Sequence, residues 1–183
     1  MTCIDGDVLD GPQLPITSEK GGRVSHGGTL PPVLLSVIRL RFIQMFLRER
    51  QMKLIKRILG ICETRQPSDA ESWRYENGRI TARFSRLPEL GRPGGAVRLE
   101  GGGLPRRILL VHGMDGQFRA FANRCTHMGR RLDPLPGKDR IECCSVSKST
   151  FTYEGEPVSG AAKAPIETFL VEINGDVLWI RIG

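Results

Sequence analysis

Short runs of alternating apolar and polar residues, separated by turn residues, follow one another from Ile80 to the end of the chain. Ile80, Ala82 and Phe84 alternate with polar residues, as along a strand with one buried face. Further short runs lie at residues 96–99, 108–111, 118–123, 141–144, 150–153, 169–173 and 177–182. The 183 residues include 22 glycines and 12 prolines, which supply turns and argue against an all-helical bundle. The pattern predicts a small all-β domain of short strands.

Two turn signals indicate how neighbouring strands pair. Asp115-Gly116 separates two of these runs, and Asn174-Gly175 separates the last two. Such dipeptides favour the tight turn of an antiparallel hairpin, because these residue types accept the backbone angles that the turn requires. We therefore expect two hairpins within a β domain that extends over residues 78–183.

A different pattern precedes the β domain. Residues 33–59 contain no glycine or proline, Pro32 stands where a helix tolerates proline, and Gly60 follows as a stop. In the second half, apolar side chains share one face of the helix and basic side chains lie opposite. The apolar face is formed by Leu54, Ile55, Ile58 and Leu59, and the basic face by Lys53, Lys56 and Arg57. The pattern predicts a basic amphipathic helix over residues 32–60.

Most of the positive charge of the chain lies in this helix. Residues 39–57 carry seven basic side chains against one glutamate, and the formal net charge of the chain is +7. The helix has three candidate contacts: its own domain or a second subunit, a membrane surface, and nucleic acid. Nucleic acid is the least expected, because no aromatic residues interleave with the bases. The apolar run 33–47 contains two arginines and is too short to cross a bilayer.

The remaining segments carry little periodicity. Residues 1–31 are rich in Gly, Pro, Ser and Thr, which indicates a disordered arm, and residues 61–77 form a polar connector. The five cysteines are an odd number, and the first residues lack the basic and apolar regions of a secretory signal. We therefore expect a reducing, cytoplasmic setting, with peripheral membrane contact through the helix, and metal chemistry rather than a disulfide framework.

Two predicted loops gather residue types that bind iron. The first box, CTHMGRRL, begins at Cys125 directly after a strand, and the second box, CSVSKSTF, begins at Cys144. Cysteine and histidine side chains on two such loops hold a mixed-ligand [2Fe–2S] cluster, with thiolates on one iron and imidazoles on the other. The two boxes therefore point to an iron–sulfur site.

With these boxes the chain resembles the Rieske proteins, above all the soluble Rieske-type ferredoxins that feed electrons to oxygenases. The similarity also covers the turn YEGEP at 153–157, the Gly/Pro-rich stretch SGAAKAP at 159–165 and the terminal hairpin VEINGDVLWIRI. The resemblance spans roughly residues 78–183. It implies a small antiparallel β domain, a [2Fe–2S] cluster and electron transfer to a redox partner protein.

The resemblance places Cys125 and His127 at the ligand positions of the first box. In the second box, counting back from Phe151 places Cys144 at the cysteine position and Ser147 at the second histidine position. Three of the four family ligands are therefore present, and a serine replaces the fourth. A serine ligand would bind as an alkoxide, which adds negative charge and lowers the potential of the cluster.

Other positions also depart from the family. Lys148 stands where the family has glycine, and Arg130 and Val146 stand where respiratory members carry an additional disulfide. His112 lies on an earlier strand and is expected to be an ordinary strand residue. Cys143 precedes the second-box cysteine, and the alternation of a strand predicts that its side chain points to the opposite face.

Three interpretations follow from these residues. In the first, the domain binds an atypical [2Fe–2S] cluster and carries electrons. In the second, it has lost the cluster and serves as an interaction or redox-sensing module. In the third, Cys125, His127 and Cys144 hold a single metal ion such as zinc. Nothing indicates hydrolysis or phosphoryl transfer. We therefore expect an electron-transfer component of an oxidoreductase system rather than a stand-alone enzyme.

Overall fold

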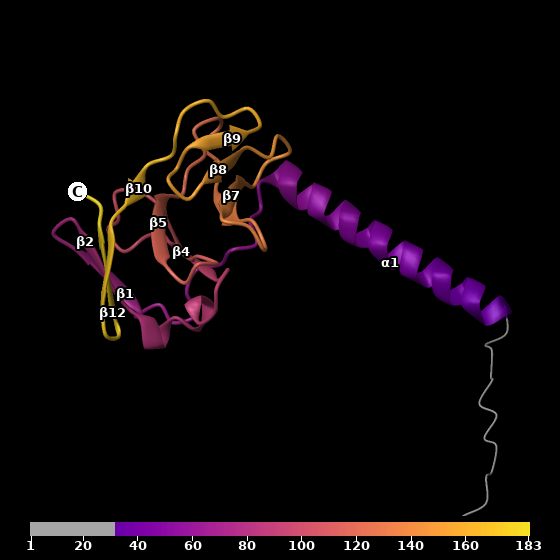
Figure 1. Ribbon diagram of the computed structural model, residues 1–183, viewed down its shortest axis with the longest axis horizontal. Helices are drawn as coiled ribbons and strands as arrows, with labels where there is room; N and C mark the ends of the chain where they lie inside the picture. Colours follow the sequence, from indigo (N-terminus) through magenta and orange to yellow (C-terminus); the bar gives the residue numbers. More distant parts are fainter. Residues whose placement is uncertain (1–31) are drawn as a thin grey trace, which may run out of the picture. The chain divides into compact units, whose positions relative to one another are not determined.

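One helix and three antiparallel sheets make up the described part of the chain (Figure 1). The computed structural model describes residues 32–183, with side chains from residue 39 onward. The expected arm at 1–31, which contains His26, lies outside the described residues. Residues 42–183 form one compact unit. The prediction of an all-β domain preceded by a helix is confirmed.

Helix α1 extends over Pro32–Leu59. Gly60 follows with φ +69°, the left-handed conformation that commonly ends a helix. Side chains from residues 39 to 55 are exposed on every face of α1, whereas Lys56 and Arg57 are partly buried. None of the helices in residues 32–183 combines the length and apolar character needed to cross a membrane.

Each sheet has four strands, and neighbouring strands are hydrogen-bonded. The first sheet has the order β1 (Trp73–Glu76), β2 (Arg79–Arg83), β12 (Val177–Arg181), β11 (Val171–Asn174). The second has the order β10 (Thr168–Phe169), β5 (Phe118–Ala122), β4 (Ile108–His112), β3 (Ala96–Leu99). The third has the order β6 (Leu132–Pro134), β7 (Arg140–Cys143), β8 (Thr150–Thr152), β9 (Pro157–Ser159). Two short 3-10 helices, η1 (Phe84–Arg86) and η2 (Pro88–Leu90), follow β2.

The two hairpins predicted from the turn signals are present. Strands β4 and β5 pair around Asp115-Gly116, and β11 and β12 pair around Asn174-Gly175. Three strands, β1, β6 and β9, were not predicted, and the predicted strand 169–173 is divided between β10 of the second sheet and β11 of the first. Strand β1 lies inside the segment expected to be a connector. Its polar sequence does not indicate a strand, and the strand forms because β2 supplies the hydrogen-bonding partner. These short strands form through their neighbours rather than through their own pattern.

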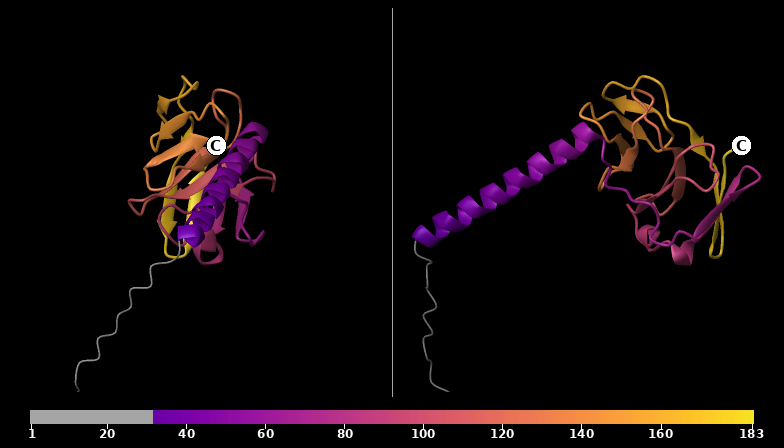
Figure 2. Two further views of the ribbon diagram at one scale, coloured as in Figure 1. Left: turned by 90° about the vertical axis from the view of Figure 1, so that its right-hand side faces the viewer. Right: turned by 180° about the vertical axis from the view of Figure 1, so that it is seen from behind.

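The second sheet lies between the other two within the β domain (Figures 1 and 2). Two buried apolar clusters fill the spaces on its faces. The first is built from strands of the first and second sheets and includes Ile80, Leu110 and Ile180. The second includes Leu109 and Phe151 and lies against the third sheet. The second cluster also includes Cys125, in the loop after β5, and Cys143, at the end of β7.

Candidate metal centre

The first box forms a closed loop after strand β5. The Cys125 N–H donates to the Arg130 carbonyl at 2.7 Å, and the Gly129 N–H donates to the Cys125 carbonyl at 2.7 Å. Buried Asn123 braces this loop, because its Oδ1 accepts the Leu132 N–H at 2.7 Å. The loop thereby holds the Cys125 side chain inside the protein and leaves His127 exposed.

The second box forms a tight loop between β7 and β8. The Ser145 N–H donates to the Cys143 carbonyl at 2.8 Å. Lys148 has φ +48°, in the left-handed region that favours glycine. This is the position where the family has glycine, so the loop keeps a glycine-like backbone although a lysine occupies it. Buried Ser149 then ties the loop to residues 161 and 162, whose N–H groups donate to its Oγ at 3.1 and 3.0 Å.

The tips of the two loops meet at His127 and Ser147. The Ser147 Oγ lies 3.5 Å from His127 Nδ1 and 2.8 Å from Ser145 Oγ. Both His127 and Ser147 are exposed, so this contact lies at the surface. The structure therefore brings together the first-box histidine and the serine that replaces the second histidine.

A pair of buried thiols lies beneath these tips. Cys125 and Cys143 belong to the same apolar cluster and are 1% and 0% exposed. Burial raises the pKa of the Cys143 thiol to about 11, and a hydrogen bond with the Cys125 thiol adds to the rise. The alternation of β7 turns Cys143 inward, on the face that the sequence analysis had assigned to its neighbour. The sulfur that faces Cys125 thus comes from Cys143.

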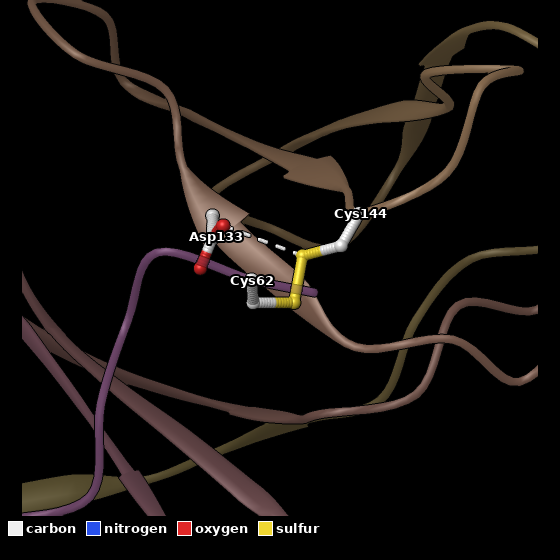
Figure 3. Close-up of side chains that lie close together, drawn as sticks. All are labelled: Cys62, Asp133 and Cys144. Atoms are coloured by element: carbon white, nitrogen blue, oxygen red, sulfur yellow. Dashed lines mark hydrogen bonds between the residues drawn. A yellow bond between two sulfur atoms is a disulfide. The ribbon is translucent and has the colours of Figure 1, made fainter. Parts of the chain in front are cut away.

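The neighbour, Cys144, points to the other side and forms a disulfide with Cys62. The two residues lie 82 positions apart in the sequence, with Cα atoms 5.4 Å apart. Figure 3 shows the disulfide beside Asp133, whose Oδ2 lies 3.3 Å from the Cys144 sulfur. The sequence analysis argued against disulfides from the odd number of cysteines, and this bond corrects that expectation; no local pattern around Cys62 indicates its partner.

The C-terminal end of α1 is fastened to both loops. Arg57 pairs with Glu142 and donates to the Ser145 carbonyl at 3.4 Å. Arg130 of the first box donates to the Arg57 carbonyl at 3.3 Å and to the Ile58 carbonyl at 3.1 Å. These carbonyls belong to the last turn of the helix, where few backbone N–H groups remain to bond them, and the Arg57 carbonyl also accepts the Gly60 N–H at 3.2 Å. Two arginines that the sequence marked only as charges therefore join the helix end to the candidate centre.

His112 is engaged elsewhere. Its Nδ1 lies 2.7 Å from the Leu90 carbonyl, and its ring stacks on Phe118 with centroids 4.4 Å apart. Among residues 39–183, the two boxes therefore share a single imidazole, that of His127.

The family comparison agrees with this geometry. Residues 89–170 match the family model of the Rieske [2Fe-2S] domain, a range that contains both boxes and the second and third sheets. The predicted resemblance to the Rieske proteins is confirmed over these residues. Helix α1 and strands β1, β2, β11 and β12 lie outside the matched range.

Solved structures with similarity to the chain include a Rieske protein and two carbazole dioxygenase structures. The plasma membrane Rieske protein PetC3 from Synechocystis PCC 6803 is 21% identical, with 45% of this chain and 84% of that chain covered and a TM-score of 0.39. The ferredoxin of carbazole 1,9a-dioxygenase from Nocardioides aromaticivorans IC177 is 21% identical, covering 56% and 98%, with a TM-score of 0.47. A complex of reduced oxygenase and oxidized ferredoxin in carbazole 1,9a-dioxygenase is 22% identical. The match covers 58% of this chain and 94% of that chain, with a TM-score of 0.47. No curated protein matches the chain.

A Rieske domain implies a [2Fe–2S] cluster, so the side chains present were compared with the ligands that such a cluster needs. The buried thiols of Cys125 and Cys143 fit the thiolate pair of one iron. His127 offers one imidazole to the other iron, and Ser147 offers a hydroxyl where the second imidazole is expected. The donor set fits the sulfur side of the cluster and one of its two nitrogen positions.

Proposed function

We propose that this protein is an electron carrier that holds a [2Fe–2S] cluster between the two boxes with an atypical ligand set. The observation that supports the proposal is the meeting of the two loops, with Cys125 and Cys143 buried together and His127 beside Ser147. When bound, such a cluster takes up and releases a single electron. A redox partner protein would dock at the exposed side chain of His127.

The protein environment prepares the two sides of this centre differently. The sulfur side is buried in an apolar cluster, which excludes water from the thiols. Because burial raises the Cys143 pKa to about 11, the thiol is protonated at neutral pH until a cation replaces its proton. The outer side is exposed, and Ser147 adds a hydroxyl instead of a neutral imidazole. We therefore expect a potential below that of a cluster with two histidines.

The sequence and the structure favour different cysteines as the second-box ligand of the cluster. The family register favours Cys144, whereas the packing favours Cys143. We propose Cys143, because Cys144 has its sulfur in the disulfide with Cys62. Single Cys143→Ser and Cys144→Ser variants, purified without oxygen, separate the two assignments.

The test of the function measures iron, acid-labile sulfide, visible absorption and the electron paramagnetic resonance signal after reduction. The wild type is expected to contain about two irons and two sulfides, as a [2Fe–2S] cluster requires. Cys143→Ser should lose the cluster and Cys144→Ser should retain it. Ser147→His should raise both cluster content and potential. A colourless, iron-free wild type prepared from iron-replete cells would overturn the proposal.

The disulfide supports a second candidate function. Cys62 and Cys144 connect the segment after α1 with the second box, and the described boxes contain a single histidine. A Rieske-type fold without a cluster could use this bond as a redox-sensitive connection in an interaction module. Iron-free protein whose Cys62–Cys144 bond opens and closes over cellular thiol potentials would favour this function over electron transfer.

Helix α1 supplies a contact segment in either case. Apolar side chains including Phe42, Phe46 and Ile55 are about half exposed or more, at 63%, 57% and 48%. Bases lie among them along the same helix. We propose that this segment binds an anionic membrane surface and holds the domain there as a peripheral protein. A second protein subunit is the competing occupant that the same exposed face would suit.

A further inference from the structure

We propose that reduction of the Cys62–Cys144 disulfide creates a zinc site whose protein ligands are Cys62, Cys144 and Asp133. This site shares no ligand with the proposed cluster, and it rests on the assignment of Cys143 rather than Cys144 to that cluster. The two sulfurs and a carboxylate oxygen all lie within 4.8 Å of one another. Figure 3 shows the three side chains converging from three different segments of the chain. Two thiolates and a carboxylate are ligands that Zn²⁺ binds well.

The geometry needs a small adjustment on one side only. In a tetrahedral zinc site, two sulfurs stand about 3.8 Å apart, and a sulfur and an oxygen stand about 3.6 Å apart. The Cys144 sulfur already lies 3.3 Å from Asp133 Oδ2. Once the bond is reduced, the Cys62 sulfur must move away from Cys144. Cys62 lies in a segment with no helix or strand, so side-chain rotation and a small backbone shift allow this movement.

The carboxylate is oriented by backbone donors. Asp133 Oδ2 accepts the Glu63 N–H at 2.8 Å, and Oδ1 accepts the Thr64 N–H at 2.9 Å. Each oxygen keeps a second lone pair for a cation, and hydrogen-bonded carboxylates make better-defined metal ligands. The same two bonds hold the chain beside Cys62 close to Asp133, so the ligand triad remains assembled after reduction.

Access to the triad is provided by a neighbouring cavity of about 360 Å³, whose lining includes Asp133 and Cys144. Three bases line it, Lys53 and two others that are paired with acids: Lys56 contacts Glu63 at 2.8 Å, and Arg57 pairs with Glu142. Because each of these two paired bases is neutralised by its own acid, neither one neutralises the negative charge of the Asp133 carboxylate. The cavity has room for a water molecule as the fourth zinc ligand.

The chemistry balances with a phosphine reductant. The phosphine gives two electrons to the disulfide and becomes a phosphine oxide with oxygen from water, while the two sulfurs take the protons of that water. Zinc then replaces both thiol protons, which pass to the solvent. The product is one Zn²⁺ with two thiolates, one carboxylate and one water. Re-oxidation of the sulfurs would expel the metal, because a disulfide offers no thiolate.

The experiment titrates anaerobically purified, phosphine-reduced full-length protein, with its iron retained and quantified, with Zn²⁺ alone against a chromogenic chelator. It is repeated with Co²⁺, whose absorption reports thiolate ligands. The wild type should bind one metal with thiolate-to-cobalt absorption, and the oxidised protein should bind none at this site. Cys62→Ser and Cys144→Ser should abolish the site, and Asp133→Asn should weaken it about tenfold or more. Asp115→Asn, in the turn between β4 and β5 with its side chain on Arg119, is the matched control.

Cys143→Ser separates this site from the proposed cluster. It should lose iron and sulfide yet bind zinc as the wild type does, whereas Cys62→Ser should retain iron and lose zinc. Circular dichroism checks that each variant is folded. If Asp133→Asn does not fold, zinc binding by Cys62→Ser tests the site instead. Wild-type zinc binding by Cys62→Ser, zinc loss in Cys143→Ser, or no stoichiometric zinc in the reduced wild type would each overturn the inference.

Discussion

Cys62 and Cys144 are joined by a disulfide that closes a loop of 82 positions in the sequence. The bond connects the segment after α1 with the second box, at the point where the Asp133 carboxylate also binds that segment. Adjacent Cys143 faces the opposite way and packs with Cys125. Two neighbouring cysteines thus belong to two different sulfur pairs, and each pair is open to a separate test.

The first prediction concerns the contribution of the disulfide to stability. Cys62→Ser should lower the free energy of unfolding of the oxidised protein by up to about 4 kcal/mol, the value for a cross-linked loop of this length. Urea denaturation with a chelator present measures it. Adding a reductant should remove the difference between the variant and the wild type. A difference that persists after reduction would show that the cysteine acts through packing instead.

Ser149 tests the support of the second box. Its Oγ is fully buried and accepts the N–H groups of Ala161 and Ala162. Ser149→Ala leaves both donors without an acceptor and should cost about 1–3 kcal/mol of unfolding free energy. Exposed Ser159, whose Oγ contacts Thr150 Oγ1 at 2.7 Å, is the control, and Ser159→Ala should cost less than about 0.5 kcal/mol. Equal losses in urea denaturation would contradict the assignment.

The pH dependence of stability should include a contribution from Glu100. Two hydrogen bonds from Arg131, at 2.7 and 2.9 Å, hold the pKa of this carboxyl below its usual value of 4.5. A lowered folded-state pKa means that the stabilisation is complete above the unfolded-state value. It is lost as the pH falls through the folded-state pKa. The wild type should therefore exceed Glu100→Gln by a constant margin near pH 7, and the margin should shrink below about pH 4.5.

Urea denaturation of both proteins from pH 7 down to pH 3 measures this margin. Arg131→Gln should remove most of the difference, because it takes away the partner that lowers the Glu100 pKa. A margin that does not change with pH, or that survives in the Arg131→Gln background, would assign the effect to packing.

Arg57 tests the attachment of the helix end. Arg57→Gln removes the pairing with Glu142 and weakens the contact with the Ser145 carbonyl, which should cost about 1–2 kcal/mol. The amides of residues 58–63 should then exchange with deuterium at least several-fold faster. Arg48→Gln on the exposed part of the same helix is the control and should leave their exchange unchanged. Unchanged exchange in both variants would mean that the helix end is held without Arg57.

The exposed helix surface makes a prediction about membranes. The full-length protein should co-sediment with anionic lipid vesicles and bind neutral vesicles weakly, because its bases are attracted to anionic headgroups. High salt should release it, because ions screen that attraction. A Phe42→Ser, Phe46→Ser double variant should bind at least tenfold more weakly, since both side chains are more than half exposed. Lack of sedimentation, together with a concentration-dependent dimer, would assign this surface to a protein subunit.

The local pattern determined most of the secondary structure. Glycine-containing turns predicted the two hairpins, and runs of apolar residues or their alternation with polar ones predicted strands such as β2 and β4. The uninterrupted run before Gly60 set the helix. These features depend on interactions between residues close in the chain, so the amino-acid order carries them directly. The two box motifs likewise predicted the similarity to the Rieske proteins.

The tertiary structure decided which sulfur meets which. Alternation along β7 predicts that Cys143 and Cys144 point apart, but only the placement of the third sheet over the second core decides which one faces inward. The pairing of Cys62 with Cys144 joins segments 82 positions apart, and no local pattern encodes the distance between them. The capping of the helix end by Arg130 has the same origin, since a contact across 72 positions exists only once the chain has folded.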